Sequence, residues 1–236
     1  MHIYLCLLLC VFVFVCVCVC VCVCVCVCVC VIIIVNYMLL LLLLGLPCVG
    51  VDLNEEQWLS VLSVCGERQL LPVLDSAYQG FASGDLQRDA FSARLFVERF
   101  CGAFFVTQSF AKNLGLYGER VGMVHAVCAS PKEAEAVLSQ IKIVARRAYS
   151  NPPLHGARIL ARVLRCKELR RQWEEELHAV ACRIKRVRGL LREGLEKKKT
   201  PGPWHHITDQ IGMFSYTGLT SMFATYTQTT PQRHPK

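Results

Sequence analysis

Residues 102–128 read GAFFVTQSFAKNLGLYGERVGMVHAVC, with two apolar runs on either side of a polar segment that holds one lysine, Lys112. The runs in GAFFVTQSFAK and RVGMVHAVCA are rich in Phe and Val, which predicts two strands of a sheet. Two glycines, a tyrosine and an arginine follow the lysine before the second run. Lys112 is either a solvated surface charge or the functional centre of the segment, and the surrounding sequence has to distinguish these readings.

On the N-terminal side of this stretch, helix and strand signals alternate. The segment DLNEEQW puts Asn54 and Gln57 at the spacing of a capping box, which predicts the start of a helix. Leu70 to Leu74 is a short apolar run that ends at Asp75 and continues into a turn rich in Gly and Ser, so we expect another strand. The segment DAFSARLFVERF then has helical periodicity.

On the C-terminal side, PKEAEAVLSQIKIVARRAY predicts a helix that stops at SNPP, because Pro152 disfavours the α conformation at the residue before it. A long amphipathic helix follows and ends near KKKTPGPW. Its apolar residues recur at spacings of three and four: Leu169, Trp173, Leu177, Val180, Ile184, Val187 and Leu191. Strands that alternate with helices predict an α/β layered fold with a parallel sheet.

Asp75 and Lys112 each lie at or just past the carboxyl end of a predicted strand. In open α/β sheets ligands bind beyond these ends, so both side chains could face one crevice. The alternative is that Asp75 caps a helix or forms a turn and that Lys112 is solvated. The pattern of residues leaves both possibilities open.

The first 50 residues differ from the rest, because they contain no Asp, Glu, Lys or Arg and the net charge of +8 arises from residues 51–236. They read CVCVCVCVCVCVCVC from Cys16 to Cys30, inside an apolar stretch from Ile3 to about Leu44. This exceeds the ~20 residues that a transmembrane helix needs, but no basic residue flanks it. A signal peptide has a positive start and a shorter apolar core.

A tandem TG dinucleotide repeat would explain the strict alternation, since TGT and GTG codons encode Cys and Val. We therefore expect residues 1–49 to be translated non-coding sequence that is not part of the fold, with a membrane anchor as the less favoured alternative. The part of the chain after residue 50 has about the size of one domain.

The other cysteines, Cys65, Cys101, Cys128, Cys166 and Cys182, show neither CxxC nor Cys/His ligand spacing. We expect isolated buried thiols in a reducing compartment.

Metal and nucleic-acid binding both lack support. His205, His206 and Asp209 could be considered as metal ligands, but adjacent histidines point in different directions and no further ligand lies at a suitable spacing. We therefore assign no metal. The basic residues of RRQWEEELHAVACRIKRVRGLLREGLEKKK alternate with glutamates, which is typical of a solvated helix face rather than a nucleic-acid surface.

Four segments carry a resemblance: LDSAYQGFASGDL, QSFAKNLGLYGERVG, SNPPLHGARI and WHHITDQIGMFSYTGL. In order, they resemble the aspartate aminotransferase family, cytosolic type, of the fold-type-I pyridoxal-phosphate-dependent transferases. The resemblance runs from about Gly50 to Leu219 and implies part of the family's large domain, a mainly parallel sheet flanked by helices. Residues 220–236 form a divergent tail. It also implies a cytoplasmic enzyme that transfers the amino group between L-aspartate and 2-oxoglutarate, with oxaloacetate and glutamate as products.

The resemblance assigns five residues to pyridoxal 5'-phosphate. Lys112 matches the catalytic lysine that binds the cofactor covalently and then moves the proton at the substrate's α-carbon. Asp75 matches the carboxylate that pairs with the pyridine nitrogen and keeps it protonated. Tyr78 matches the phenol that hydrogen-bonds the ring oxygen, and Ser109 and Arg120 match phosphate ligands.

Arg146 matches the arginine that enters the neighbouring subunit's site and binds the distal carboxylate of the substrate. The resemblance therefore implies a homodimer. Arg146 and Arg147 are adjacent, and the distance to SNPP selects the first. For either arginine the alternative is a solvated helix face.

The chain also departs from the family pattern. Pro47 stands where the family carries an asparagine that contacts the cofactor, and Arg233 does not lie in the motif that binds the substrate's α-carboxylate. We therefore keep a second reading, a catalytically inactive aminotransferase-like fragment or incomplete gene product, in which cofactor binding is weak and turnover nearly absent.

Overall fold

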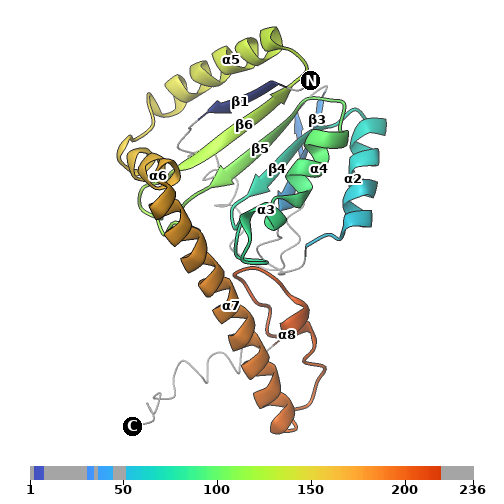
Figure 1. Ribbon diagram of the computed structural model, residues 1–236. Coiled ribbons are helices and arrows are strands. Elements are labelled where there is room, and N and C mark those ends of the chain that lie inside the picture. The colour runs from blue at the N-terminus through green and yellow to red at the C-terminus, as the bar shows by residue number, and fades with distance from the viewer. Residues whose placement is uncertain (1–2, 8–30, 35–36, 45–51, 219–236) are drawn as a thin grey trace.

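The computed structural model describes residues 3–7, 31–34, 37–44 and 52–218, which form a six-stranded sheet with helices packed against it (Figure 1). The strand order is β1-β6-β5-β4-β3-β2. The strands are β1 Ile3–Leu7, β2 Val31–Ile34, β3 Tyr37–Leu44, β4 Leu71–Ser76, β5 Phe104–Ser109 and β6 Gly122–Cys128. The α/β class predicted from the sequence is confirmed.

Parallel pairing is confined to the middle of the sheet. β4 is parallel to both β3 and β5, whereas the pairs β1·β6, β5·β6 and β2·β3 are antiparallel. The connections explain the difference, because a parallel pair needs a long crossover. The chain passes from β4 to β5 through two helices, but from β5 to β6 through a helix-free segment that contains Lys112.

Three strands of this sheet come from the apolar N-terminal part of the chain. β3 lies beside β4, with Leu39 opposite Leu71 and Leu44 opposite Ser76, and β1 lies beside β6. This differs from the expectation that residues 1–49 are not part of the fold. The Cys/Val repeat of residues 16–30 and the divergent tail of residues 220–236 lie outside the described residues.

Four of the described helices were predicted from the sequence, whereas Leu86–Asp89, His155–Arg165 and His206–Asp209 were not. The described helices are α2 Glu55–Glu67, α3 Leu86–Asp89, α4 Phe91–Arg99, α5 Pro131–Tyr149, α6 His155–Arg165, α7 Lys167–Lys197 and α8 His206–Asp209. The capping box of α2 is confirmed, since Asn54 Oδ1 accepts from Gln57 N and Gln57 Oε1 accepts from Asn54 N, each at 2.9 Å. The helix predicted before SNPP is α5.

The main core lies between one face of the sheet and helices α2 and α4. Trp58 of α2 packs edge-on against Phe96 of α4 with ring centroids 6.2 Å apart, and Val127 of β6 joins the same cluster. Successive side chains of a strand point to opposite faces. Cys128 accordingly packs with Ala134 of α5 in a second cluster, so β6 contributes to both clusters.

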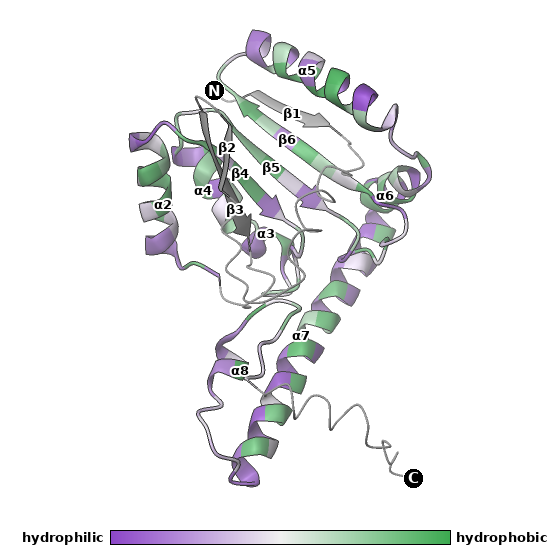
Figure 2. Cartoon of the chain, turned by 180° about the vertical axis from the view of Figure 1, so that it is seen from behind, coloured by the Kyte–Doolittle hydropathy of each residue, from purple (hydrophilic) through white to green (hydrophobic). Residues whose placement is uncertain are grey.

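Helix α7 has 31 residues and extends away from the sheet, with α8 beside its far end (Figure 1). The apolar face predicted for it is only partly buried. Leu177 and Ala181 are buried as part of the fold, but Val180 and Val187 are 43% and 51% exposed. Hydrophobic and hydrophilic residues accordingly alternate along α7 (Figure 2).

The expectation of buried thiols holds for two cysteines and is wrong for the others. Cys65 and Cys128 are buried, Cys166 is half-buried, and Cys101 and Cys182 are exposed. All five are free thiols.

The loop after β4 approaches α7 so closely that it needs a glycine. Gly80 has φ of 96°, and a Cβ added there would lie 2.2 Å from Leu177 Cδ2 and 2.9 Å from its Cγ. Backbone conformation and space therefore both exclude a side chain.

We expect Gly80→Ala to lower the free energy of unfolding by about 2 kcal/mol or more, because strain and overpacking act together. The matched control is Gly189→Ala within α7, where nothing lies within 4 Å of the added Cβ. This control should be neutral or more stable by up to about 1 kcal/mol. Urea denaturation of both variants checks the pair, and equal stabilities would contradict it.

Candidate active site

Two adjacent parallel strands bring predicted site residues to one edge of the sheet. Asp75 of β4 lies opposite Thr107 of β5, and Lys112 follows the end of β5. A pocket of about 200 Å³ opens at this edge. It is lined by Asp75, Ala77, Thr107, Gln108, Ser109, Ala111, Lys112, Arg120, Val121 and Gly122. Four of the six predicted residues therefore share one pocket.

The Asp75 carboxyl at this edge has a shifted pKa. Burial raises its pKa above the ordinary value, while a hydrogen bond from Thr107 and the positive charge of Lys112 act in the opposite direction. Thr107 Oγ1 donates to Asp75 Oδ1 at 3.1 Å. A buried carboxylate with one neutral donor and a nearby ammonium is suited to pair with a further cation.

Lys112 faces an aromatic ring. Its Nζ lies 5.2 Å from the centroid of the Tyr78 ring, in the range of a cation–π contact. Tyr78 packs edge-on against Phe81 and Phe214, with ring centroids 6.5 and 5.5 Å away. Tyr78 also lines a larger pocket of about 420 Å³.

Ser109 and Arg120 supply a hydroxyl and a guanidinium to the smaller pocket. Ser109 Oγ accepts from Ala111 N at 3.3 Å, and Arg120 Nη1 donates to Tyr117 O at 3.3 Å. Arg120 has φ of 52°, in the left-handed region that non-glycine residues rarely adopt. Strained residues of this kind concentrate at functional sites. The pair can serve an anion.

Two residues to which the sequence analysis gave no part in the site, Asn113 and Trp173, hold the turn that carries Lys112. Asn113 is only 6% exposed, and its Nδ2 donates to Gln79 O at 3.3 Å. Trp173 of α7 donates from Nε1 to Asn113 O at 2.8 Å. These contacts link positions 34 and 60 residues apart, so no local pattern signals them.

The side chains of Gln79, Gln108 and His125 form a second series of polar contacts. Gln108 Nε2 donates to Gln79 Oε1 at 2.5 Å, and Gln108 Oε1 lies 3.4 Å from His125 Nε2. Burial lowers the pKa of His125, which favours the neutral imidazole. With Nε2 protonated, His125 donates to Gln108 and fixes the orientation of both amides.

The structure does not bring Arg146 to this pocket. Arg146 is exposed in the last turn of α5, and its Nη1 donates to Ser150 Oγ at 2.5 Å. It lines neither of the two pockets described above.

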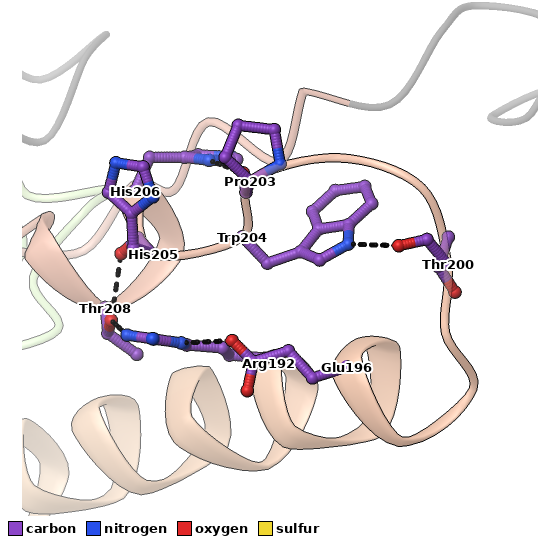
Figure 3. A network of polar contacts seen from close by, with 8 residues as sticks. All are labelled: Arg192, Glu196, Thr200, Pro203, Trp204, His205, His206 and Thr208. Atoms are coloured by element: carbon purple, nitrogen blue, oxygen red, sulfur yellow. Dashed lines mark hydrogen bonds and ion pairs between the residues drawn. The ribbon is translucent and has the colours of Figure 1, made fainter.

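Of the two histidines weighed as metal ligands, His206 has its ring nitrogens beside backbone oxygens. His206 Nδ1 lies 2.9 Å from Pro203 O, and its Nε2 lies 3.3 Å from Thr217 O, near the contacts drawn in Figure 3. Among the described residues, no group of three or more His, Cys, Asp or Glu could hold a metal ion. In that same part of the chain, no helix has the length and apolar character needed to cross a membrane.

The combined arrangement is an amine at a strand end, a buried carboxylate within reach of its charge, and an anion-binding pair. An amine of this kind can attack a carbonyl carbon, and the carboxylate can hold a cationic ring. The fold is therefore that of an α/β protein with a lysine, a buried carboxylate, a hydroxyl and a guanidinium around one pocket at the edge of its sheet.

A family model described as aminotransferase class I and II matches residues 48–230. This chain belongs to the class I and II aminotransferase family. The match continues past Leu219, where the resemblance seen in the sequence was expected to stop.

Curated relatives give the family match more detail. The chain is 52% identical over 171 residues to cytoplasmic aspartate aminotransferase of Schizosaccharomyces pombe, covering 72% of this chain and 42% of the relative. It is 49% identical over 170 residues to mitochondrial aspartate aminotransferase of Gallus gallus, covering 72% and 40%. The chain thus spans less than half the length of these relatives.

Solved structures share the fold. Aspartate aminotransferase from Trypanosoma cruzi has a TM-score of 0.73 and 45% identity, covering 78% of this chain and 47% of that one. An aromatic-amino-acid aminotransferase from Burkholderia pseudomallei, covalently bound to pyridoxal phosphate, has a TM-score of 0.75 and 44% identity, covering 79% and 46%. These neighbours support the expected fold type.

We expect Asp75→Asn to raise the thermal midpoint at neutral pH. A folded-state pKa raised above the unfolded value means that the acid's stabilising contribution is present below the ordinary value of 3.8 and is lost as pH rises. Asparagine keeps the Oδ1 acceptor for Thr107 but carries no charge. The difference in thermal midpoint between Asp75→Asn and the parent chain should therefore vanish in acid. Thermal unfolding between pH 3 and 8 measures this difference.

Asp85→Asn is the control, because the pKa of Asp85 is shifted in the opposite direction to that of Asp75. Backbone N–H groups of Arg88 and Gln87 lower the pKa of Asp85, so its contribution is present at neutral pH and lost in acid. This variant should not be more stable than the parent chain at pH 7. If both substitutions stabilised the protein, or if neither did, the conclusion that the ionised form of Asp75 is unfavourable would be contradicted.

Proposed function

We propose that this chain acts as a pyridoxal-phosphate-dependent aspartate aminotransferase, transferring the amino group between L-aspartate and 2-oxoglutarate. One observation carries the proposal: the parallel strands β4 and β5 end beside one pocket that Asp75, Ser109, Lys112 and Arg120 line together. Relatives named aspartate aminotransferase support the substrate pair. Cytoplasmic relatives support a cytoplasmic location, although others are mitochondrial.

The donor set fits pyridoxal 5'-phosphate. Lys112 would hold the carbonyl carbon covalently, Asp75 would hold the protonated ring nitrogen, and Tyr78 would donate to the ring oxygen. Ser109 and Arg120 would bind the phosphate, because a hydroxyl and a guanidinium fork suit a dianion. When bound, the cofactor supplies an electron sink for carbanion chemistry.

Asp75, Lys112 and Tyr78 would each have a separate role in the reaction. Asp75 is buried beside Thr107, so it can stay paired with a cationic nitrogen without competition from bulk water. Lys112 would move the proton at the substrate's α-carbon once its amine is released. The Tyr78 ring limits where that amine can go, since Nζ lies over it.

Arg146 would read the substrate's distal carboxylate from the neighbouring subunit of a homodimer. In support, its side chain is exposed at the end of α5 and donates to the neutral hydroxyl of Ser150. A guanidinium fork facing outward is suited to a carboxylate supplied across an interface.

The second candidate is a non-catalytic member of the family. Pro47 favours it, because proline cannot supply the side-chain amide of the asparagine that the family carries at this position. Such a chain would bind the cofactor weakly and turn over little.

The decisive test is covalent capture of pyridoxal phosphate by Lys112. The full chain is incubated with pyridoxal phosphate, reduced with borohydride, and mapped by peptide mass spectrometry. We expect Lys112 to be labelled preferentially over exposed Lys142, and Lys112→Ala to abolish that signal while Lys142→Ala leaves it. Equal labelling of both lysines would overturn the proposal. Selective labelling without turnover of aspartate and 2-oxoglutarate would favour the second candidate.

Arg146→Ala tests the side-chain specificity. Losing a charge-assisted contact to a carboxylate removes roughly 1.5–3 kcal/mol, about 10- to 100-fold in kcat/KM. We expect that loss for aspartate and little for aromatic substrates, with Arg147→Ala as the matched control from the adjacent position. A similar loss in both variants would remove Arg146 from the site.

A further inference from the structure

Arg188 is an unusual residue of α7, because it is only 6% exposed and its guanidinium donates to three backbone carbonyl oxygens. It donates to Gln210 O, to Gly212 O at 2.9 Å and to Phe214 O at 2.6 Å. Burying a guanidinium is unfavourable unless its donors are satisfied. Here one side chain holds three acceptors that lie 22 to 26 residues further along the chain.

Two further hydrogen bonds join the ends of the segment 210–216 that Arg188 holds. Gln210 Nε2 donates to Tyr216 O at 2.9 Å, and Gln210 Oε1 accepts from Tyr216 N at 2.7 Å. Gln210 is also 6% exposed. Residues 210–216 therefore form a loop with a buried polar anchor, not a freely moving connection.

The loop delivers one side chain to the candidate active site. The Phe214 ring packs edge-on against Tyr78, with centroids 5.5 Å apart and planes at 82°. Lys112 Nζ lies 5.2 Å from the centroid of the same Tyr78 ring. A continuous series of contacts thus runs from Arg188 through Phe214 and Tyr78 to the amine.

We propose that Arg188 is a positioning residue that fixes the Lys112 amine by holding Phe214 against Tyr78. Edge-to-face aromatic pairs favour one relative orientation, and the cation–π contact depends on where the ring face points. Loss of the Phe214 ring removes the nearer of the two edge-on aromatic contacts of Tyr78, so the Tyr78 ring can tilt and its contact with the ammonium weakens. The positioning itself needs no cofactor, and only its consequence for transamination rests on the proposed function.

The test measures how readily the Lys112 amine reacts. The full chain is treated with a trace of acetic anhydride, and acetylation of Lys112 is compared with that of exposed Lys142 by mass spectrometry. An ammonium held over a ring must leave it before it can react as an amine. We expect Arg188→Met and Phe214→Ala each to raise the Lys112 to Lys142 ratio about two- to fivefold, the strength of an exposed cation–π contact.

Arg192 provides the matched control. It lies one turn further along α7 and donates to Glu196 and to Thr208 of α8, whereas Arg188 donates to carbonyl oxygens of the 210–216 loop (Figure 3). Arg192→Met should leave the ratio unchanged. Phe214→Tyr, which keeps the ring, should also retain the parent ratio.

A double variant separates positioning from general loosening. If Arg188 acts through Phe214, adding Arg188→Met to Phe214→Ala raises the ratio no further, although the thermal midpoint still falls. An unchanged ratio in Phe214→Ala, or an equal rise in Arg192→Met, overturns the proposal. Phe214 is 47% exposed, so its variants test the idea even where Arg188→Met does not fold.

Failure of the acetylation test can be distinguished from failure of the proposed function. Acetylation is carried out on the chain without added pyridoxal phosphate, so the ratio reports the Arg188 contacts and not cofactor binding. Conversely, unselective capture of pyridoxal phosphate by the parent chain would contradict the proposed function and leave the acetylation result standing.

Discussion

The parallel pairing of β4 with β5 is the constraint on which the rest of the site depends. Because both strands run in one direction, their carboxyl ends meet at the same edge, and Asp75 and Lys112 meet there although 37 positions separate them. The crossover through α3 and α4 makes that direction possible. The next connection lacks a helix, so β6 returns antiparallel and the segment around Lys112 stays at the edge of the pocket.

Stability and function oppose each other at Asp75. Burial disfavours its ionised form, and one hydrogen bond from Thr107 with a nearby ammonium only partly offsets this. A bound cation would complete the compensation. Under the proposed function, the cost of ionising Asp75 in the free protein would be offset when the cofactor binds, which is the usual trade between stability and activity.

Helix α7 connects to the site at three points, although little of it touches the sheet. Trp173 holds the backbone beside Lys112, Leu177 packs under Gly80, and Arg188 anchors the loop that carries Phe214. The spacings of four and eleven positions place these three residues on one side of the helix. The face that was expected to be buried from its apolar spacing includes Val180 and Val187, which are exposed in the described structure.

The sequence by itself determined the local elements: the capping box of α2, the helix before SNPP, and the strands that end near Asp75 and Lys112. Such signals depend on neighbours a few positions apart. Only the tertiary structure decided the antiparallel return of β6, the buried side of α7, and the contacts of Arg188 and Phe214. Those features join residues tens of positions apart, and no local spacing encodes which distant group will meet another.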